Sequence, residues 1–153
     1  MFEGCSMSDS LPDFDLDRYL PYRFAVIATR LSNELSTQYR EKYGISIAEW
    51  RVLVNLAYSD STSVRDIEKR VSMEKSKVSR AVSRLQESGY LTKEIDSNDR
   101  RLLQLELTPK GAKLVGDLVP LAQAYQRQLE AQLMDKVPGL QTALDELMKD
   151  ADL

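Results

Sequence analysis

Histidine is absent from the 153-residue sequence, and cysteine occurs once, at Cys5. Without histidine, His-based triads, His general bases and nearly all zinc and haem sites are excluded. A single cysteine cannot form an intramolecular disulfide, and its scarcity favours the reducing cytoplasm. These absences favour a binding protein that needs no metal or cofactor over an enzyme.

Long apolar runs are also missing. No segment approaches the roughly 18 apolar residues of a membrane span, and the start lacks the basic and apolar regions of a secretory signal. Five prolines and six glycines are too few for a Pro-rich linker or a collagen-like chain. The apolar content of 42% and charged content of 29% are those of a globular protein, so we expect one domain, or one that dimerises, without a membrane partner.

The net charge of −3 conceals a basic centre. Residues 1–69 carry 8 basic and 11 acidic side chains, and residues 111–153 carry 4 basic and 7 acidic ones. Residues 70–110 between them carry 9 basic and 6 acidic side chains. Because local charge steers a phosphate backbone more than the total does, this central part is a weak candidate for nucleic-acid binding.

Residues 1–14 show no sustained periodicity, and we expect a flexible tail in which Met7 is an alternative start. A helix is predicted to follow, capped by Asp15 or Asp17 and running to about Lys42. Gly44 is expected to end it. Its apolar side chains recur at helical spacing: Phe24, Ile27, Ala28, Leu31 and Leu35.

Three shorter helices are predicted next, the last two separated by a tight turn. Ser46 with Glu49 three residues later is a capping-box pattern, and Gly89 is expected to follow a last helix that ends near Ser88. The expected core positions are Trp50, Leu53, Val54 and Ala57 in the first, Val64, Ile67 and Val71 in the second, and Val78, Ala81, Val82 and Leu85 in the third.

The apolar period then changes from 3.6 to 2. Leu103–Leu107 alternates apolar and polar residues, Leu91–Ile95 is its expected partner strand, and the polar run Asp96–Arg101 is the loop of a hairpin. Thr108-Pro109 predicts the start of a long helix, which Pro120 bends without ending. The apolar seams of the C-terminal part are Val115, Leu118, Ala122, Tyr125 and Leu129, then Leu140, Leu144 and Leu147.

The predicted helix before the hairpin has a basic, hydroxyl-rich face opposite its apolar stripe. Such side chains donate to phosphates and base edges, and a helix fits the major groove. The start of the helix is expected to reach bases, and Arg80 and Arg84 to contact phosphates; a merely solvated face is the alternative. The candidate DNA-binding residues are Lys75, Ser76, Lys77, Ser79, Arg80 and Arg84, with Ser83 on the same face.

The hairpin tip and the segment after it resemble the MarR family of bacterial transcriptional regulators. The residues that carry the resemblance are Asp99-Arg100-Arg101, Leu105, Leu107-Thr108 and Gly111, together with Ser76–Arg80, Leu85 and Gly89. The resemblance implies a mostly α-helical fold with a small β-hairpin wing. It places a winged helix-turn-helix DNA-binding domain at residues 45–108 and dimerisation helices at residues 15–44 and 109–153.

The resemblance also implies roles at the wing. Arg101 is expected to enter the minor groove, where narrow A·T-rich stretches concentrate negative potential. Asp99 is expected to brace Arg101, and Arg100 to contact a phosphate. The alternative is an exposed loop ion pair of little consequence.

A homodimer on a pseudo-palindromic operator, with recognition helices about 34–36 Å apart, is implied in turn. It would repress transcription by occupying a promoter until a small, aromatic or anionic effector releases it; activation stays open. The candidate effector-binding residues are Tyr19, Tyr22, Arg23, Ile27 and Trp50, unless they are core aromatics and a snorkelling arginine.

Three other hypotheses stay open. A winged-helix protein-interaction module without DNA binding would be expected to lack the cationic tip. A redox-sensing regulator of the same fold would use Cys5, which we expect to be incidental in the tail. An enzyme using Glu34 and Glu41 lacks a nucleophile, a metal cluster or a Gly-rich loop beside them.

Overall fold

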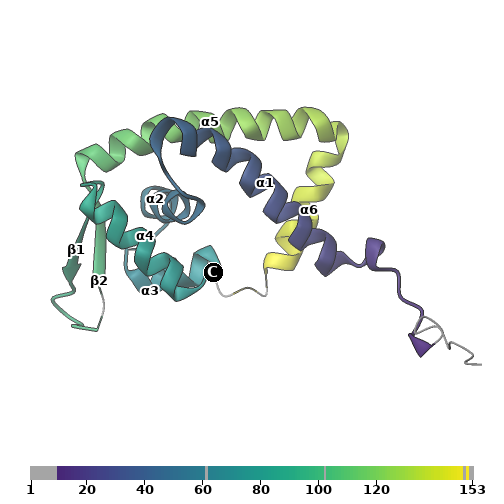
Figure 1. Ribbon diagram of the computed structural model, residues 1–153, viewed down its shortest axis with the longest axis horizontal. Coiled ribbons are helices and arrows are strands. Elements are labelled where there is room, and N and C mark those ends of the chain that lie inside the picture. The colour runs from purple at the N-terminus through teal and green to yellow at the C-terminus, as the bar shows by residue number, and fades with distance from the viewer. Residues whose placement is uncertain (1–9, 61, 102, 150, 152–153) are drawn as a thin grey trace, which may run out of the picture.

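The computed structural model describes residues 10–60, 62–101, 103–149 and 151. These residues confirm the predicted fold class, mainly helical with one antiparallel hairpin (Figure 1). In chain order the elements are η2 (Leu16–Arg18), α1 (Leu20–Tyr43), α2 (Ile47–Tyr58), α3 (Val64–Val71), α4 (Lys75–Glu87), β1 (Leu91–Ile95), β2 (Leu103–Leu107), α5 (Pro109–Leu133), η3 (Met134–Lys136) and α6 (Val137–Met148). Cys5, Met1 and Met7 lie outside the described residues, as does most of the predicted tail.

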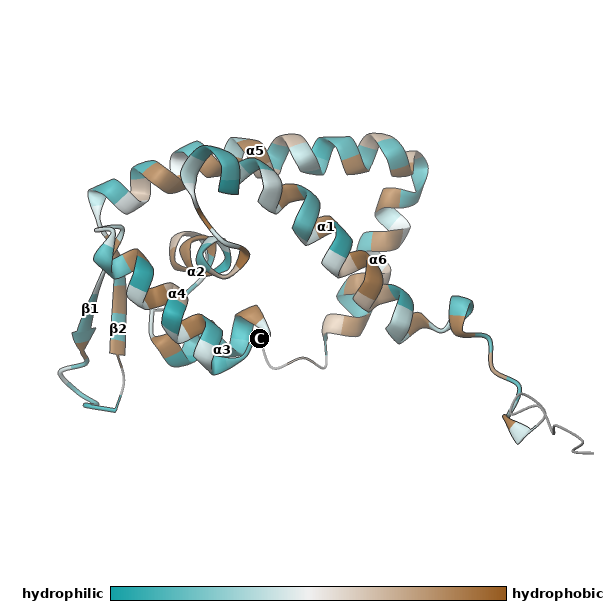
Figure 2. Ribbon diagram, in the orientation of Figure 1, coloured by the Kyte–Doolittle hydropathy of each residue, from teal (hydrophilic) through white to brown (hydrophobic). Residues whose placement is uncertain are grey.

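The elements form two parts joined by the long helix α5. Helices α2, α3 and α4 and the hairpin gather at one end of the molecule, and α5 extends from the hairpin toward the other end (Figure 1). The C-terminal half of α1 packs on α5 and α2, whereas its N-terminal half extends away from the helices and hairpin at that end. Figure 2 shows apolar residues along this N-terminal half and on α6.

The core lies within the compact end. Its buried apolar residues are Tyr39, Ile45, Val52, Leu53, Ile67, Val71, Val78, Ala81, Val82, Leu85, Leu91, Leu105, Leu114, Val115 and Leu118. The predicted buried face of α4 is confirmed in full, whereas the predicted stripe of α2 is partly wrong. Leu53 is buried as predicted, and Val52, which the predicted stripe does not include, is buried too, because α2 contacts α1, α3, α4, α5 and β2 and so buries more than one stripe. Ala57, by contrast, is exposed.

The start of α1 also differs from the prediction. Leu16–Arg18 forms a separate 3-10 turn, Asp15 makes no side-chain cap bond, and α1 begins at Leu20. A helix that started at Asp15 or Asp17 would carry Pro21 beyond its first turn, where proline removes a hydrogen bond and clashes with the preceding turn. Proline is tolerated in the first turn, so the helix begins immediately before Pro21.

The junction between the hairpin and α5 explains the Thr-x-x-Gly spacing. Thr108 Oγ1 accepts a hydrogen bond from Gly111 N at 3.0 Å and donates one to Gly89 O at 2.6 Å, and Thr108 N donates to Tyr90 O at 3.1 Å. A Cβ atom at Gly111 would lie 1.9 Å from Tyr90 O, so only glycine fits. Gly89, with φ of 80°, makes the turn out of α4 in a left-handed conformation.

The hairpin is held against the helices along its second strand. β1 and β2 pair antiparallel with Lys93 opposite Leu105, and Leu105 N donates to Thr62 O at 2.7 Å on the other side. This bond, with a bridge between Ser63 and Gln104, fixes β2 to the segment before α3. The loop that joins the strands therefore projects from an anchored base.

Candidate nucleic-acid interface

Helix α4 presents its polar face to solvent. Lys75, Ser76, Lys77, Ser79, Arg80 and Arg84 are exposed, and Ser83 is half-buried. The turn before α4 is short because Ser72, with φ of 52°, ends α3 in the left-handed conformation. Two helices joined by this turn, followed by a hairpin, are the order of a winged helix-turn-helix.

A small hollow of about 230 Å³ lies between α4 and the start of α2. Lys77, Arg80 and Arg84 from α4 line it beside Ala48 of α2 and Ser46, the N-cap of that helix. The backbone N–H groups at the start of a helix attract anions, and Lys and Arg side chains do the same. The three cations and the N-terminus of α2 therefore both favour a phosphate in this region. The capping-box pattern predicts only that Ser46 caps α2; its place beside the α4 cations depends on tertiary packing.

Arg84 is less available than the sequence indicates. Its guanidinium lies 3.8 Å from the carboxylate of Glu49, whose side chain is only 9% exposed. Ser46 Oγ donates to that same carboxylate at 3.1 Å and accepts from Glu49 N at 3.2 Å. Glu49 thus links the capping box of α2 to helix α4, a role that the sequence alone did not indicate.

At the loop of the hairpin, Asp99 and Arg101 are in contact. Asp99 Oδ1 accepts hydrogen bonds from Arg101 N at 3.0 Å and from Arg101 Nε at 3.2 Å. The Arg101 side chain is nevertheless 84% exposed, and Arg100 beside it is exposed too. The contact that the D-x-R resemblance implied is therefore present while the guanidinium stays accessible to a ligand.

A second carboxylate organises the same loop, and sequence reasoning missed it. Asp96 Oδ1 accepts from the backbone N–H groups of Asn98 at 2.7 Å and Asp99 at 2.9 Å, and Asp96 Oδ2 accepts from Gln104 Nε2 at 2.8 Å. The two backbone hydrogen bonds, and to a smaller extent the bond from Gln104, hold the pKa of Asp96 below its ordinary value. The Asp-x-Asn pattern typical of such turns was the signal in the sequence.

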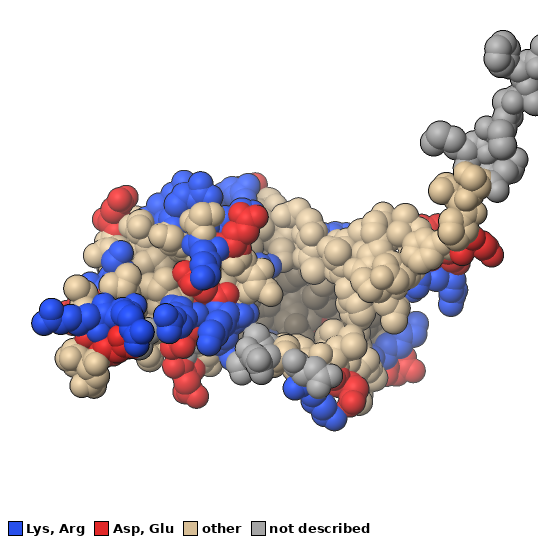
Figure 3. Space-filling view, turned by 90° about the horizontal axis from the view of Figure 1, so that it is seen from below, with Lys and Arg blue, Asp and Glu red and all other residues tan. Residues whose placement is uncertain are grey.

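Seen from below, the cationic groups gather over the end of the molecule that carries the helix-turn-helix and the hairpin, with some acidic groups among them (Figure 3). A hollow separates this end from the other helices in that view. The basic centre expected from the charge distribution is thus a surface feature as well as a stretch of sequence.

The structure does not bring the five candidate effector residues together within one chain. Tyr19, Tyr22, Arg23 and Ile27 are exposed at and after the start of α1. Trp50 instead stacks on Tyr39 of the same chain, with ring centroids 5.6 Å apart. Tyr39 follows Ile27 by twelve residues, about 18 Å along a helix.

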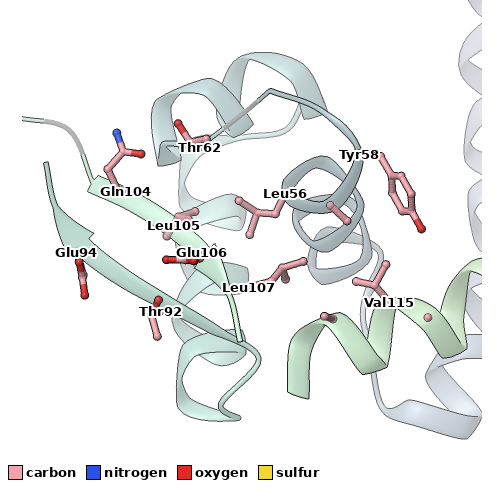
Figure 4. A pocket seen from close by; sticks show the side chains of 13 residues that line it. Leu56, Tyr58, Thr62, Thr92, Glu94, Gln104, Leu105, Glu106, Leu107 and Val115 are labelled. Carbon is pink, nitrogen blue, oxygen red and sulfur yellow. The ribbon is translucent and has the colours of Figure 1, made fainter. Parts of the chain in front are cut away.

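A larger pocket of about 750 Å³ lies elsewhere, between the hairpin, the end of α2 and the start of α5 (Figure 4). Apolar residues such as Leu56, Leu107 and Val115 line it together with Glu94 and Glu106. Its lining contains carboxylates and no Lys or Arg, so its charge disfavours an anionic ligand.

Glu34, one of the two carboxylates of the enzyme hypothesis, has structural partners. Tyr125 Oη donates to Glu34 Oε2 at 2.6 Å and Arg30 Nε donates to Glu34 Oε1 at 2.9 Å, joining α1 to α5. The Tyr125 bond, with that from Arg30, lowers the pKa of Glu34, and burial together with this carboxylate raises the pKa of Tyr125 to about 12. This arrangement holds an ionised carboxylate between two donors.

Over the described stretches of the chain, no group of three or more Cys, Asp or Glu side chains is arranged to hold a metal ion. None of the helices in these stretches has both the length and the hydropathy needed to span a bilayer.

Fold and surface together define a winged helix-turn-helix protein. Residues 43–102 match the family model described as MarR family. A MarR/EmrR family transcriptional regulator from Acinetobacter sp. ADP1 has a similar structure, with a TM-score of 0.80 and 28% identity over 91% of this chain and 99% of that one. Over residues 43–102 the chain is similar to the MarR family, and over nearly its whole length its fold is that of a transcriptional regulator.

Two further relatives are more distant. The HTH-type transcriptional regulator BilQ of Clostridioides difficile (strain CD3) is 26% identical over 54% of this chain, a match that spans only 56% of BilQ. BpsR of Bordetella bronchiseptica, whose DNA binding is regulated by 6-hydroxynicotinic acid, shares the fold with a TM-score of 0.75 and 23% identity over 92% of this chain and all of that one.

Proposed function

We propose that this protein is a cytoplasmic, homodimeric transcriptional repressor that binds a pseudo-palindromic operator. The observation that carries the proposal is the exposed cationic face of α4 beside a wing whose Arg101 is accessible and held by Asp99. A helix for the major groove and an arginine for the minor groove are the two elements needed to read double-stranded DNA from one side.

In this proposal the residues at the start of α4, Lys75, Ser76 and Lys77, reach base edges. Arg80, together with the start of α2, holds a phosphate, because the hollow between these helices is lined by cations. Arg84 contributes less to phosphate binding than its exposure indicates, since Glu49 partly neutralises it. Arg101 enters the minor groove, and Arg100 contacts the adjacent backbone.

The dimer follows from the exposed apolar residues outside the winged part. Leu20 is 59% exposed and Ile27 48% exposed, and they lie on the same half of α1 as Phe24, also exposed. On α6, Leu140 and Leu147 are exposed as well. Exposed apolar residues at helical spacing, as on α1, mark an interaction site, and a second copy of the same helices would cover them.

Binding to the operator is measured by fluorescence anisotropy on the DNA upstream of the protein's own gene, with random DNA as the control. A dimer that neutralises six to ten phosphates loses roughly 10³–10⁵-fold in affinity between about 50 and 200 mM salt. Arg101→Ala is expected to cost about 1–3 kcal/mol on the operator and much less on random DNA. Equal, weak binding to both DNAs at low salt, unaffected by Arg101→Ala, would contradict the proposal.

The oligomeric state is measured by light scattering at several protein concentrations. Ile27→Glu places a charge on the exposed half of α1, where burial against a second copy would be costly, so it should yield monomers. Thr29→Glu is the matched control, because Thr29 is exposed on the same helix and its replacement removes no large apolar side chain. This variant should perturb the dimer much less. A wild-type chain that is monomeric at micromolar concentration would refute the dimer.

Release by an effector is the second part of the proposal. Its support is the regulation of BpsR by 6-hydroxynicotinic acid and the exposure of Tyr19, Tyr22 and Arg23, which a dimer would bring beside a second chain. Arg23 supplies the charge for an anionic ligand that the pocket beside the hairpin lacks. Aromatic carboxylic acids that neither raise the melting temperature nor weaken operator binding would remove this part.

The two alternatives within the fold predict different results. A protein-interaction module binds neither operator nor random DNA in a salt-dependent way. A redox regulator that uses Cys5 loses operator binding with peroxide, and Cys5→Ser abolishes that loss. The accessible cations of the α4 face and the wing favour a DNA-binding regulator over the protein-interaction module. The regulation of BpsR by 6-hydroxynicotinic acid favours a ligand over an oxidant as the releasing signal.

A further inference from the structure

The loop at the tip of the wing contains two carboxylates that act on different parts of it. Asp99 binds Arg101 directly, through the backbone N–H and Nε of the arginine. Asp96 instead binds the backbone N–H groups of Asn98 and Asp99. The position of the Asp99 carboxylate, and with it that of Arg101, therefore depends on Asp96.

Gln104 fixes Asp96 from the opposite strand. Its Nε2 donates to Asp96 Oδ2 at 2.8 Å, and Gln104 lies on β2, which is itself bridged to Ser63. The hydrogen bonds thus run without interruption from the anchored strand through Asp96 and Asp99 to the exposed guanidinium of Arg101. Ordering a free loop costs backbone entropy, so a loop that is already held before binding loses less entropy on contact with DNA.

We propose that Asp96 and Gln104 are positioning residues for DNA recognition: they hold the wing loop in the conformation in which Asp99 aims Arg101 at the minor groove. The inference rests on the proposed function, since it assigns Arg101 a contact with DNA. It also makes a prediction about the free protein that does not depend on DNA.

Charge alone predicts the opposite effect, which makes the sign of the result informative. Asp96 is an acidic residue on a loop that faces DNA, so removing its charge should tighten binding if electrostatics were its only role. Positioning predicts that Asp96→Ala weakens binding. Glu94→Ala is the matched control, because Glu94 is an exposed acidic residue on the adjacent strand; it should leave affinity unchanged or raise it.

The test on DNA is a double-mutant cycle on the operator. Arg101→Ala alone should lose about 5- to 150-fold in affinity, the range expected for one base contact. Asp96→Ala should lose a similar factor, and adding Arg101→Ala to it should cost less than about threefold more. Asp96→Asn keeps the acceptor for the backbone N–H groups and should recover part of the affinity, whereas Gln104→Glu sets two carboxylates together and should behave like Asp96→Ala.

The test on the free protein is by NMR, with ¹⁵N heteronuclear NOE values for residues 97–101 and the Nε–H signal of Arg101. Asp96→Ala should lower the NOE values to those of a flexible loop and shift the Arg101 signal, and Glu94→Ala should change neither. Unchanged loop order in Asp96→Ala would overturn the inference. So would a full additional loss on adding Arg101→Ala to Asp96→Ala, because both residues would then act independently.

These outcomes are distinguishable from failure of the proposed function. If the wild-type protein binds no DNA selectively, the proposed function fails, and the NMR comparison alone decides whether Asp96 and Gln104 hold the loop. If the wild-type protein binds its operator and Arg101→Ala weakens it, the proposed function stands, and the cycle decides the role of Asp96.

Discussion

Gly111 is the position at which this structure predicts the clearest effect of adding one methyl group. It lies in the first turn of α5, where the carbonyl of Tyr90 packs against it and accepts a hydrogen bond from Thr108 N. In Gly111→Ala the new Cβ would lie 1.9 Å from Tyr90 O and 2.9 Å from Tyr90 C. Both atoms belong to the backbone, so the contact cannot be relieved by a side-chain rotation.

The free energy of the change is the balance of three terms. Relief of the contact needs a shift of more than about 1 Å between the hairpin and α5, at the typical cost of about 1–3 kcal/mol for overpacking. Weakening of the Thr108–Tyr90 hydrogen bond adds about 0.5–1.5 kcal/mol. Alanine returns up to about 1 kcal/mol of helix propensity. We expect Gly111→Ala to lower stability by about 0.5–4.5 kcal/mol, and so the melting temperature by about 1–18 °C.

A second glycine in the same helix provides the control. Gly116 is exposed, and a Cβ atom there would meet no heavy atom within 4 Å. Gly116→Ala should therefore show the propensity gain alone, a rise in stability of about 0.5–1 kcal/mol. Two Gly→Ala changes five residues apart are thus expected to have opposite signs.

The assay is thermal unfolding followed by circular dichroism, at one protein concentration for all variants because a dimer's melting temperature depends on it. If Gly111→Ala melts at or above the wild-type temperature, the hairpin is not held rigidly against α5 and the reasoning about this junction is wrong. If Gly116→Ala is the less stable of the two variants, the open space assigned to that position is wrong.

Two further predictions concern the cations of α4 and the link between α1 and α5. Arg80→Ala should weaken operator binding more than Arg84→Ala, because the carboxylate of Glu49 already lies 3.8 Å from the Arg84 guanidinium. Fluorescence anisotropy at one salt concentration compares the two variants. Equal losses of affinity would mean that the contact between Glu49 and Arg84 does not persist in solution. Tyr125→Phe should raise the pKa of Glu34 toward its ordinary value, measured by NMR titration of the carboxyl carbon. Because the pKa of Glu34 is lower in the folded state, its contribution to stability is present above the ordinary pKa near 4.5 and is lost as the pH falls through the folded-state pKa. If Tyr125→Phe leaves the pKa of Glu34 unchanged, the Tyr125 hydrogen bond is not what lowers it.

Features that depend on residues close together in sequence were predicted well. Thr108 caps α5 and the apolar face of α4 is buried as expected, because caps and helical periodicity are set within a few positions. The predicted start of α1 was wrong because two local signals conflict there. Asp15 and Asp17 favour an earlier cap, but Pro21 restricts the first turn, and the covalent restriction of proline outweighs a cap.

At the candidate site, the sequence indicated which side chains are exposed but not what holds them. Lys77 and Arg80 stand on the face that the α4 periodicity assigns to solvent. The contact of Arg84 with Glu49 joins two helices across a tertiary interface, so no spacing rule predicts it. The same holds for Gln104 and Asp96, which the hairpin register brings together.

The first half of α1 explains why the effector residues were the least predictable. Its apolar spacing is that of a buried helix, but periodicity does not distinguish burial within a chain from burial against a second copy. In one chain Tyr22 and Ile27 stay exposed, whereas Trp50 is half-buried and stacks on the core residue Tyr39. A second copy packed on α1 would supply the opposite wall, and Arg23 would then lie beside apolar side chains of two chains. An effector site built on α1 would therefore be a property of the proposed dimer, and Leu20→Glu, at an exposed α1 residue outside the candidate effector set, should abolish effector binding together with dimerisation.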